Sequence, residues 1–167
     1  MSRISKTEAA SRRARATAEI VAHTGIDDGM IAALVHAFYA RVRDDSTLAP
    51  IFNQRISNWD VHLARMCDFW SSVVLHSGRY HGSPMQKHLD LPVDAAHFDR
   101  WLALFEVTAR EICPPPAAAY FIDRARHIAQ SLEIGIAGSN GVLLKPGARY
   151  LRTAAPSSGE ERAKQPD

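Results

Sequence analysis

The segment WDVHLARMCDFWSSVVL, residues 59–75, has the clearest helical pattern in the chain. Its buried face repeats at steps of four, three and four residues, through His62, Met66, Phe69 and Val73. This spacing is typical of an amphipathic helix and does not fit the two-residue alternation of a strand. Ser57 or Asn58 can cap the start of the helix with a side-chain oxygen. The segment therefore predicts a helix with a histidine on its apolar face.

Three further segments repeat their apolar residues at helical spacing. One follows the capping candidates Asp27 and Asp28 and is marked by Ile31, Leu34, Val35, Phe38 and Val42. A second begins after Asp94, has Phe98, Trp101, Leu102, Phe105 and Ile112 on one side, and ends at the three prolines 114–116. The last starts near Ala117, repeats through Phe121, Ala125, Ile128 and Leu132, and is expected to end at Gly135. With no strand or hairpin signal, the sequence predicts a small all-α domain.

Two shorter pieces lie between these helices. A helical turn is expected over residues 48–56, where Phe52 is large and apolar. The segment PMQKHLDLP, residues 84–92, has room for about two turns of helix, with Ser83 as its cap and Pro92 as its stop. Residues 77–83 contain two glycines and two serines and predict a loop before it. The proline-bracketed piece places His88 on a short, separate helix.

The two ends of the chain differ from its middle. Residues 1–24 are polar and basic with weak apolar periodicity, and residues 138–167 collect glycine, proline and serine. We therefore expect a flexible basic segment at 1–24, one globular domain at 25–137 and a flexible tail at 138–167. The basic start also has the composition of a transit peptide, although a flexible leader is the simpler interpretation.

Composition narrows the class of protein further. A net charge of +2 gives no reason to expect a nucleic-acid partner, and a hydrophobic fraction of 46% is ordinary for a globular chain. Cys67 and Cys113 form no CxxC pair, which favours a reducing compartment. No apolar run has the length of a membrane span, so we expect no membrane partner and a cytoplasmic location.

The pattern of the helices suits haem chemistry. A haem needs an apolar slot, a protein ligand to its iron and selected polar groups around the other face. His88 and His62 have suitable settings among the eight histidines. A surface or core role for either histidine stays open on spacing alone.

Five stretches of the chain together resemble the group III truncated haemoglobins. They read AFYARVRDDSTLAPIF (37–52), WDVHLARMCDFWSSVVL (59–75), GRYHGSPMQKHLDLP (78–92), HFDRWLALFEVT (97–108) and RARHIAQSL (124–132). The resemblance covers residues 27–136 approximately, in the family's order and without large insertions. It implies a truncated globin fold, a helical sandwich around one haem b (iron protoporphyrin IX).

The resemblance also implies roles for single residues. His88 matches the family's proximal iron ligand, Tyr39 the tyrosine of its second helix, Phe52 the phenylalanine on the haem, His62 the distal position and Trp101 the pocket tryptophan. Tyr39, His62 and Trp101 would stabilise a bound ligand. Met66, one turn beyond His62, is expected to pack against the haem and not to act as a sixth iron ligand. Arg79, Tyr80 and Lys87 are candidates for pairing with the haem propionates, or else solvated surface residues.

Such a pocket would bind dioxygen, nitric oxide or carbon monoxide. Its polar donors suit nitric oxide detoxification or a peroxidase-like reaction, and turnover would need a separate reductase because no nucleotide fingerprint occurs. The alternatives are a sensor or oxygen-storage module without turnover, and a haem-free helical interaction protein. We expect a monomer or weak dimer. On this interpretation, deletion of residues 1–20 or 141–167 leaves haem binding intact.

Overall fold

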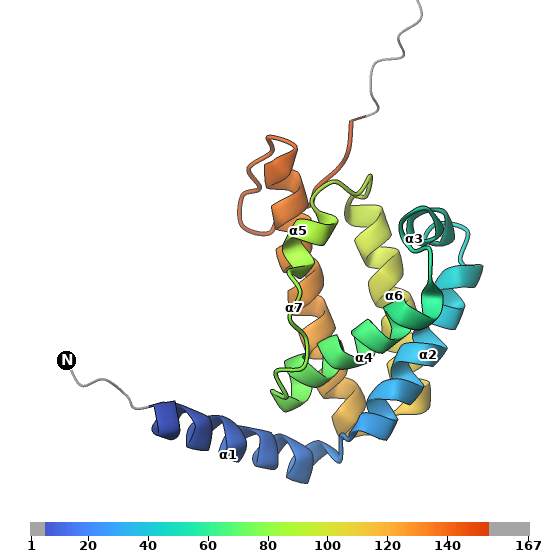
Figure 1. The fold of residues 1–167 in the computed structure, drawn as a ribbon. Helices are drawn as coiled ribbons and strands as arrows, with labels where there is room; N and C mark the ends of the chain where they lie inside the picture. The colour runs from blue at the N-terminus through green and yellow to red at the C-terminus, as the bar shows by residue number, and fades with distance from the viewer. Residues whose placement is uncertain (1–5, 154–167) are drawn as a thin grey trace, which may run out of the picture.

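The computed structural model describes residues 6–153, and this part of the chain is all-helical (Figure 1). The helices are α1 (Lys6–Thr24), α2 (Asp28–Asp44), α3 (Ala49–Arg55), α4 (Trp59–Leu75), α5 (Pro84–His88), α6 (Ala95–Ile112) and α7 (Pro115–Ser139). The predicted all-α class is therefore confirmed. Within residues 6–153, none of the helices has the length and hydropathy that crossing a membrane requires.

The starts of α2, α4 and α6 are fixed by capping residues that the sequence indicates, whereas Ser83, the predicted cap of α5, makes no side-chain capping bond. The side chain of Asp27 accepts a hydrogen bond from the N–H of Met30, at 2.8 Å. Of the two candidates before α4, Asn58 is the cap, and its side-chain oxygen accepts from the N–H of Val61. Each cap satisfies a backbone donor that the first turn of a helix leaves unpaired.

The core is organised by aromatic rings from α2, α4 and α6. Helices α6 and α7 run side by side, and α4 crosses in front of them (Figure 1). Trp70 of α4 stacks on Phe105 of α6 with centroids 5.0 Å apart, and Phe38 of α2 meets Phe105 edge-on at 5.2 Å. All three side chains are buried. Close-packed rings resist displacement, so these helices form a firm frame for the rest of the molecule.

The N-terminal segment differs from the expectation of a flexible leader. Residues 6–24 form the 19-residue helix α1, which extends away from the body (Figure 1). Alanine and arginine are strong helix formers, so this stretch can be helical without a wide apolar face. The Thr17 hydroxyl donates to the carbonyl of Leu75 at 3.0 Å and ties α1 to the end of α4. Residues 1–5 of the expected leader lie outside the described residues.

The C-terminal segment also differs, and here the expected flexible tail is packed. Helix α7 continues through Gly135 to Ser139, and the chain then returns along the body as far as residue 153. Tyr150 is only 4% exposed, and Arg149 is paired with Glu133. An extended segment held by one ring and an ion pair has no helical periodicity, which is why its sequence resembles a tail. Residues 154–167 lie outside the described part.

Candidate functional site

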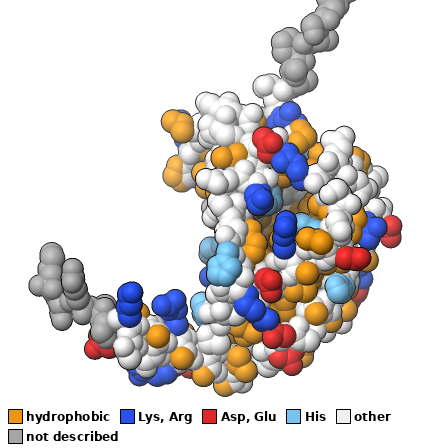
Figure 2. All heavy atoms as spheres, in the orientation of Figure 1, with side chains coloured by type: hydrophobic (Ala, Val, Ile, Leu, Met, Phe, Trp, Pro, Cys, Tyr) orange, Lys and Arg blue, Asp and Glu red, His pale blue; other side chains and the backbone are white. Residues whose placement is uncertain are grey.

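A cavity of about 880 Å³ brings together the residues that the sequence singled out. Its lining includes Tyr39, Phe52, His62, Met66, His88 and Trp101. Figure 2 shows hydrophobic, histidine and basic side chains gathered around the middle of the face between α5, α4 and α6. The volume lies within the roughly 300–1,000 Å³ range of cofactor sites in proteins. The structure thus brings residues from five helices into one apolar cavity.

His88 is the last residue of the short helix α5, which begins with Pro84 at its first turn. Its Nδ1 lies 2.6 Å from the carbonyl oxygen of Pro84. The carbonyl can only accept, so Nδ1 carries the proton and Nε2 keeps its lone pair. Burial lowers the pKa of His88, which also favours the neutral ring. A neutral imidazole with a fixed tautomer and a free Nε2 is what a metal ligand requires.

Two polar groups from α2 and α4 lie in contact within the cavity. The rings of Tyr39 and His62 are 5.2 Å apart and perpendicular. Among the described residues, His62 Nε2 is the buried side-chain atom that has no hydrogen-bond partner. Burial also raises the pKa of Tyr39, so its hydroxyl keeps its proton at all physiological pH values. An unpartnered buried nitrogen and a buried donor point to a polar ligand in the same space.

Aromatic rings support these polar groups. Phe52 of α3 meets Tyr39 edge-on at 5.9 Å, and Trp101 of α6 stacks on Phe105 at 5.4 Å. The ring of Trp59 at the start of α4 also contacts those of Tyr39, Phe52 and His62. It lies three residues before His62, so helical spacing alone could have placed it on this face.

The other histidines are less suited to hold a metal. Of the eight, His62, His88 and His97 line the cavity. His97 is engaged in the cap of α6, where its Nδ1 accepts from the N–H of Asp94 at 3.2 Å. His76 lies outside the cavity lining, with its Nδ1 hydrogen-bonded to Thr17. Within residues 6–153, no cluster of three or more histidine, cysteine or acidic side chains could hold a bare metal ion.

The basic residues around the cavity only partly match the expectation. Lys87 and Tyr80 line it, whereas Arg79 is absent from the lining, pairs with Asp28 and donates to the hydroxyl of Ser71 at 2.6 Å. Arg55 and Arg65, which the sequence did not indicate, also line the cavity. Nothing in their local spacing distinguishes them from other surface arginines. Positive charge at the edge of an apolar slot fits a planar, apolar group that carries carboxylates.

The lowered pKa values predict how the haem-free chain responds to acid. Burial is the main cause for both His62 and His88. Below pH 6.5 the unfolded chain takes up protons on these rings before the folded chain does, so stability should fall as pH decreases. Each ring contributes at most about 1.4 kcal/mol per pH unit. Urea unfolding between pH 7.5 and 5 measures the slope, and His62→Gln and His88→Gln should each reduce it. An unchanged slope in both variants would contradict the assignment.

The fold and the cavity together define a class of protein. Helices α2 to α7 line an apolar slot. A neutral histidine with a free Nε2 comes from the short helix α5, and a histidine without a hydrogen-bond partner and a buried tyrosine come from α4 and α2. These residues fit a haem, because they offer an iron ligand, aromatic walls and polar groups for a gas molecule. The arrangement is that of a globin pocket.

Comparison with known proteins agrees with this class. The sequence model of the bacterial-like globins matches residues 23–130. The chain belongs to the bacterial-like globin family, whose members bind haem and, through it, diatomic gases. The protein named group 3 truncated hemoglobin ctb, from Campylobacter jejuni, is 36% identical over 113 residues, which are 65% of this chain and 89% of that protein.

Two solved structures share the fold. The crystal structure of a group III truncated hemoglobin from Campylobacter jejuni matches with a TM-score of 0.62 and 35% identity, over 74% of this chain and 95% of that one. The hemoglobin of the thermophilic phototrophic bacterium Chloroflexus aurantiacus matches with a TM-score of 0.57 over 68% and 95% of the two chains. At 23% identity, the second likeness supports the fold alone. The resemblance to group III truncated haemoglobins and the truncated globin fold are thus confirmed.

Proposed function

We propose that the chain binds dioxygen, nitric oxide and carbon monoxide at a haem b held by His88, and that it uses bound dioxygen to convert nitric oxide to nitrate. The observation that carries this proposal is the contact between the rings of Tyr39 and His62 in an apolar cavity, together with the buried His62 Nε2, which has no hydrogen-bond partner. Simple storage of a gas requires fewer polar groups than this pocket has.

The chain's own residues have distinct tasks in this proposal. His88 supplies the iron ligand through Nε2, and Phe52, Met66 and Trp101 supply apolar surface for the porphyrin. When bound, the haem supplies the ferrous iron that binds the gas. The Tyr39 hydroxyl donates a hydrogen bond to the gas molecule, and the Trp101 indole N–H and the His62 ring are further donors nearby. Donors of this kind favour dioxygen, whose outer atom becomes partly negative, over carbon monoxide.

The proposed reaction combines nitric oxide, dioxygen and one electron into nitrate. A ferrous haem held by His88 would supply that electron, and a separate reductase would have to return one electron for each turnover. Tyr39 contributes by holding dioxygen in place and by stabilising negative charge as the new N–O bond forms. A peroxidase-like reaction is a second use of the same donors.

A stopped-flow experiment tests the reaction. The dioxygen-loaded ferrous protein is mixed with nitric oxide, and the expected result is rapid conversion to the ferric form with one nitrate formed for each haem oxidised. Tyr39→Phe should lower the yield of nitrate per nitric oxide because dioxygen escapes first. Release of dioxygen followed by binding of nitric oxide, with no nitrate, would favour the alternative of a sensor or oxygen-storage module.

A further inference from the structure

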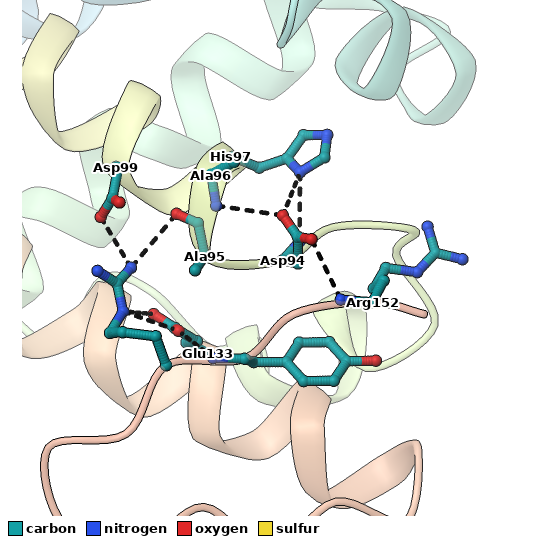
Figure 3. Close-up of polar contacts among 9 residues, drawn as sticks. Asp94, Ala95, Ala96, His97, Asp99, Glu133 and Arg152 are labelled. Atoms are coloured by element: carbon teal, nitrogen blue, oxygen red, sulfur yellow. Dashed lines mark hydrogen bonds and ion pairs between the residues drawn. The ribbon is translucent and has the colours of Figure 1, made fainter. Parts of the chain in front are cut away.

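The residues 148–152, here called the C-terminal strap, lie outside the part of the chain that matches the family. They return from the end of α7 and lie against the start of α6 (Figure 3). The strap contains Arg149, the buried Tyr150 and Leu151, which is 72% exposed. This pattern of one buried ring between exposed neighbours indicates a segment anchored at a single position.

Tyr150 packs in a buried cluster that includes part of the cavity wall. It belongs to a buried cluster with Val93, Phe98, Ala129, Ile136 and Ala137. Three members of that cluster, Val93, Phe98 and Ala129, also line the cavity itself. The strap and the cavity wall therefore share one buried cluster.

Polar contacts hold the strap in register. The N–H of Tyr150 donates to Glu133 Oε1 at 2.8 Å, and its carbonyl accepts from the N–H of Ala95 at 2.7 Å. Arg149 pairs with Glu133 and also with Asp99 (Figure 3). Glu133 is buried and the Arg149 side chain is half-exposed, so the pair is shielded from solvent on the carboxylate side.

The strap reaches the chain that leads away from His88. Along that chain the N–H of Leu91 donates to the carbonyl of His88 at 3.0 Å, and the N–H of Val93 donates to the carbonyl of Leu91 at 2.9 Å. At its far end, the carboxylate of Asp94 accepts from the N–H of Arg152 at 3.2 Å. At its near end, the Ser139 hydroxyl of α7 donates to the carbonyl of Leu89 at 2.9 Å. The segment 89–94 is thus held at both ends.

We propose that the C-terminal strap positions the proximal histidine. By packing Tyr150 into the cluster that contains Val93, and by hydrogen bonding to Asp94 and Ala95, the strap holds residues 89–94 and so fixes the direction of the His88 ring. This proposal rests on the assignment of His88 as the iron ligand. Tyr150 acts through the segment and touches neither the iron nor the gas. Contacts that orient a metal ligand typically affect metal retention by about 10- to 100-fold.

The test compares Tyr150→Ala with Leu151→Ala, a matched truncation of the exposed neighbour in the full-length haem protein. Haem loss is measured as transfer to an excess of a haem-free acceptor globin, and the iron–histidine stretching band is recorded in the ferrous, gas-free state. Tyr150→Ala should release haem about 10- to 100-fold faster and shift or broaden the band. Leu151→Ala and Tyr150→Phe should behave as the parent, because the buried ring is the part that packs. Arg149→Ala should show a smaller change of the same kind.

The band distinguishes positioning from general destabilisation. Faster haem loss in Tyr150→Ala and Arg149→Ala with an unaltered band would overturn the proposal, as would a Tyr150→Ala protein identical to the parent. If Tyr150→Ala does not fold, Arg149→Ala decides by the same two readouts. If the parent protein itself shows no iron–histidine band, the assignment of His88 fails before any strap variant is compared. The two failures are therefore distinguishable.

Discussion

Replacing His88 with alanine should abolish stable haem binding when haem is supplied at one equivalent per chain. The substitution removes the proposed iron bond and leaves only burial of the porphyrin, so haem release should accelerate by more than the roughly 100-fold upper range of outer-shell changes. The cavity and its aromatic walls stay in place, because His88 lies at the end of a helix of five residues. Added imidazole should restore binding by occupying the vacated position. Haem transfer to an acceptor globin, with and without imidazole, measures the effect.

A matched control is His81→Ala, which removes an exposed histidine from the loop before α5 and should leave haem binding unchanged. His62 and His97 are the other histidines of the cavity, and His97→Ala should retain haem. If His88→Ala kept a normal five-coordinate ferrous spectrum without added base, another residue would be the ligand, and the tautomer argument for His88 would be wrong.

Tyr39→Phe should speed the release of dioxygen by about 5- to 150-fold and that of carbon monoxide much less. The range corresponds to a hydrogen bond worth roughly 1–3 kcal/mol in a dry pocket. The phenylalanine keeps the ring that meets Phe38 and Phe52, so packing is nearly conserved and the effect can be assigned to the hydroxyl. Flash photolysis and stopped-flow displacement measure the two release rates.

Comparing the two gases removes general effects of a changed pocket. Equal acceleration for dioxygen and carbon monoxide, or none for dioxygen, would show that Tyr39 is not the principal donor. A change in the dioxygen release rate below twofold is expected only if Trp101 replaces the lost hydrogen bond to dioxygen. The double variant Tyr39→Phe with Trp101→Phe then releases dioxygen faster than the sum of the two single effects predicts. Tyr120→Phe, on α7 and outside the cavity lining, is the matched control.

Most of the domain could be predicted because its helices have apolar faces and conventional caps. Asp27, Asn58 and Asp94 begin the helices that the sequence assigns to them. The bracketing prolines likewise isolate the short helix of His88. Caps and prolines act on neighbouring residues only. Such local preferences are realised in the folded structure when the tertiary packing is consistent with them.

Gly135 shows where a local rule fails. The sequence predicts that α7 ends there, but the helix continues to Ser139. A Cβ at residue 135 would collide with the Met85 sulfur of α5, so the glycine permits close approach of the helix that carries His88. A contact between residues 50 positions apart leaves no mark on the local pattern. The C-terminal strap was missed for the same reason, since the partners of Tyr150 lie far along the chain.

Some of the cavity residues could likewise be predicted from the sequence, and others could not. Helical periodicity places His62 and Met66 on one face, and the family resemblance selects Tyr39, Phe52, His88 and Trp101. Two properties become visible only in the folded structure. His62 Nε2 is buried without a hydrogen-bond partner, and His88 Nδ1 is hydrogen-bonded to the carbonyl of Pro84. Arg55 and Arg65 have no sequence signal, because a charged residue at a cavity edge has the same local pattern as one on the open surface.

Absorption spectra of the purified full chain, after reconstitution with haem, test the central claim most directly. We expect one haem per chain, a ferrous spectrum typical of a single histidine ligand, and a sharp shift of the Soret band when carbon monoxide is added. A chain that shows no Soret absorption after reconstitution would contradict the account, and the cavity around His88 would then have to serve a haem-free helical protein.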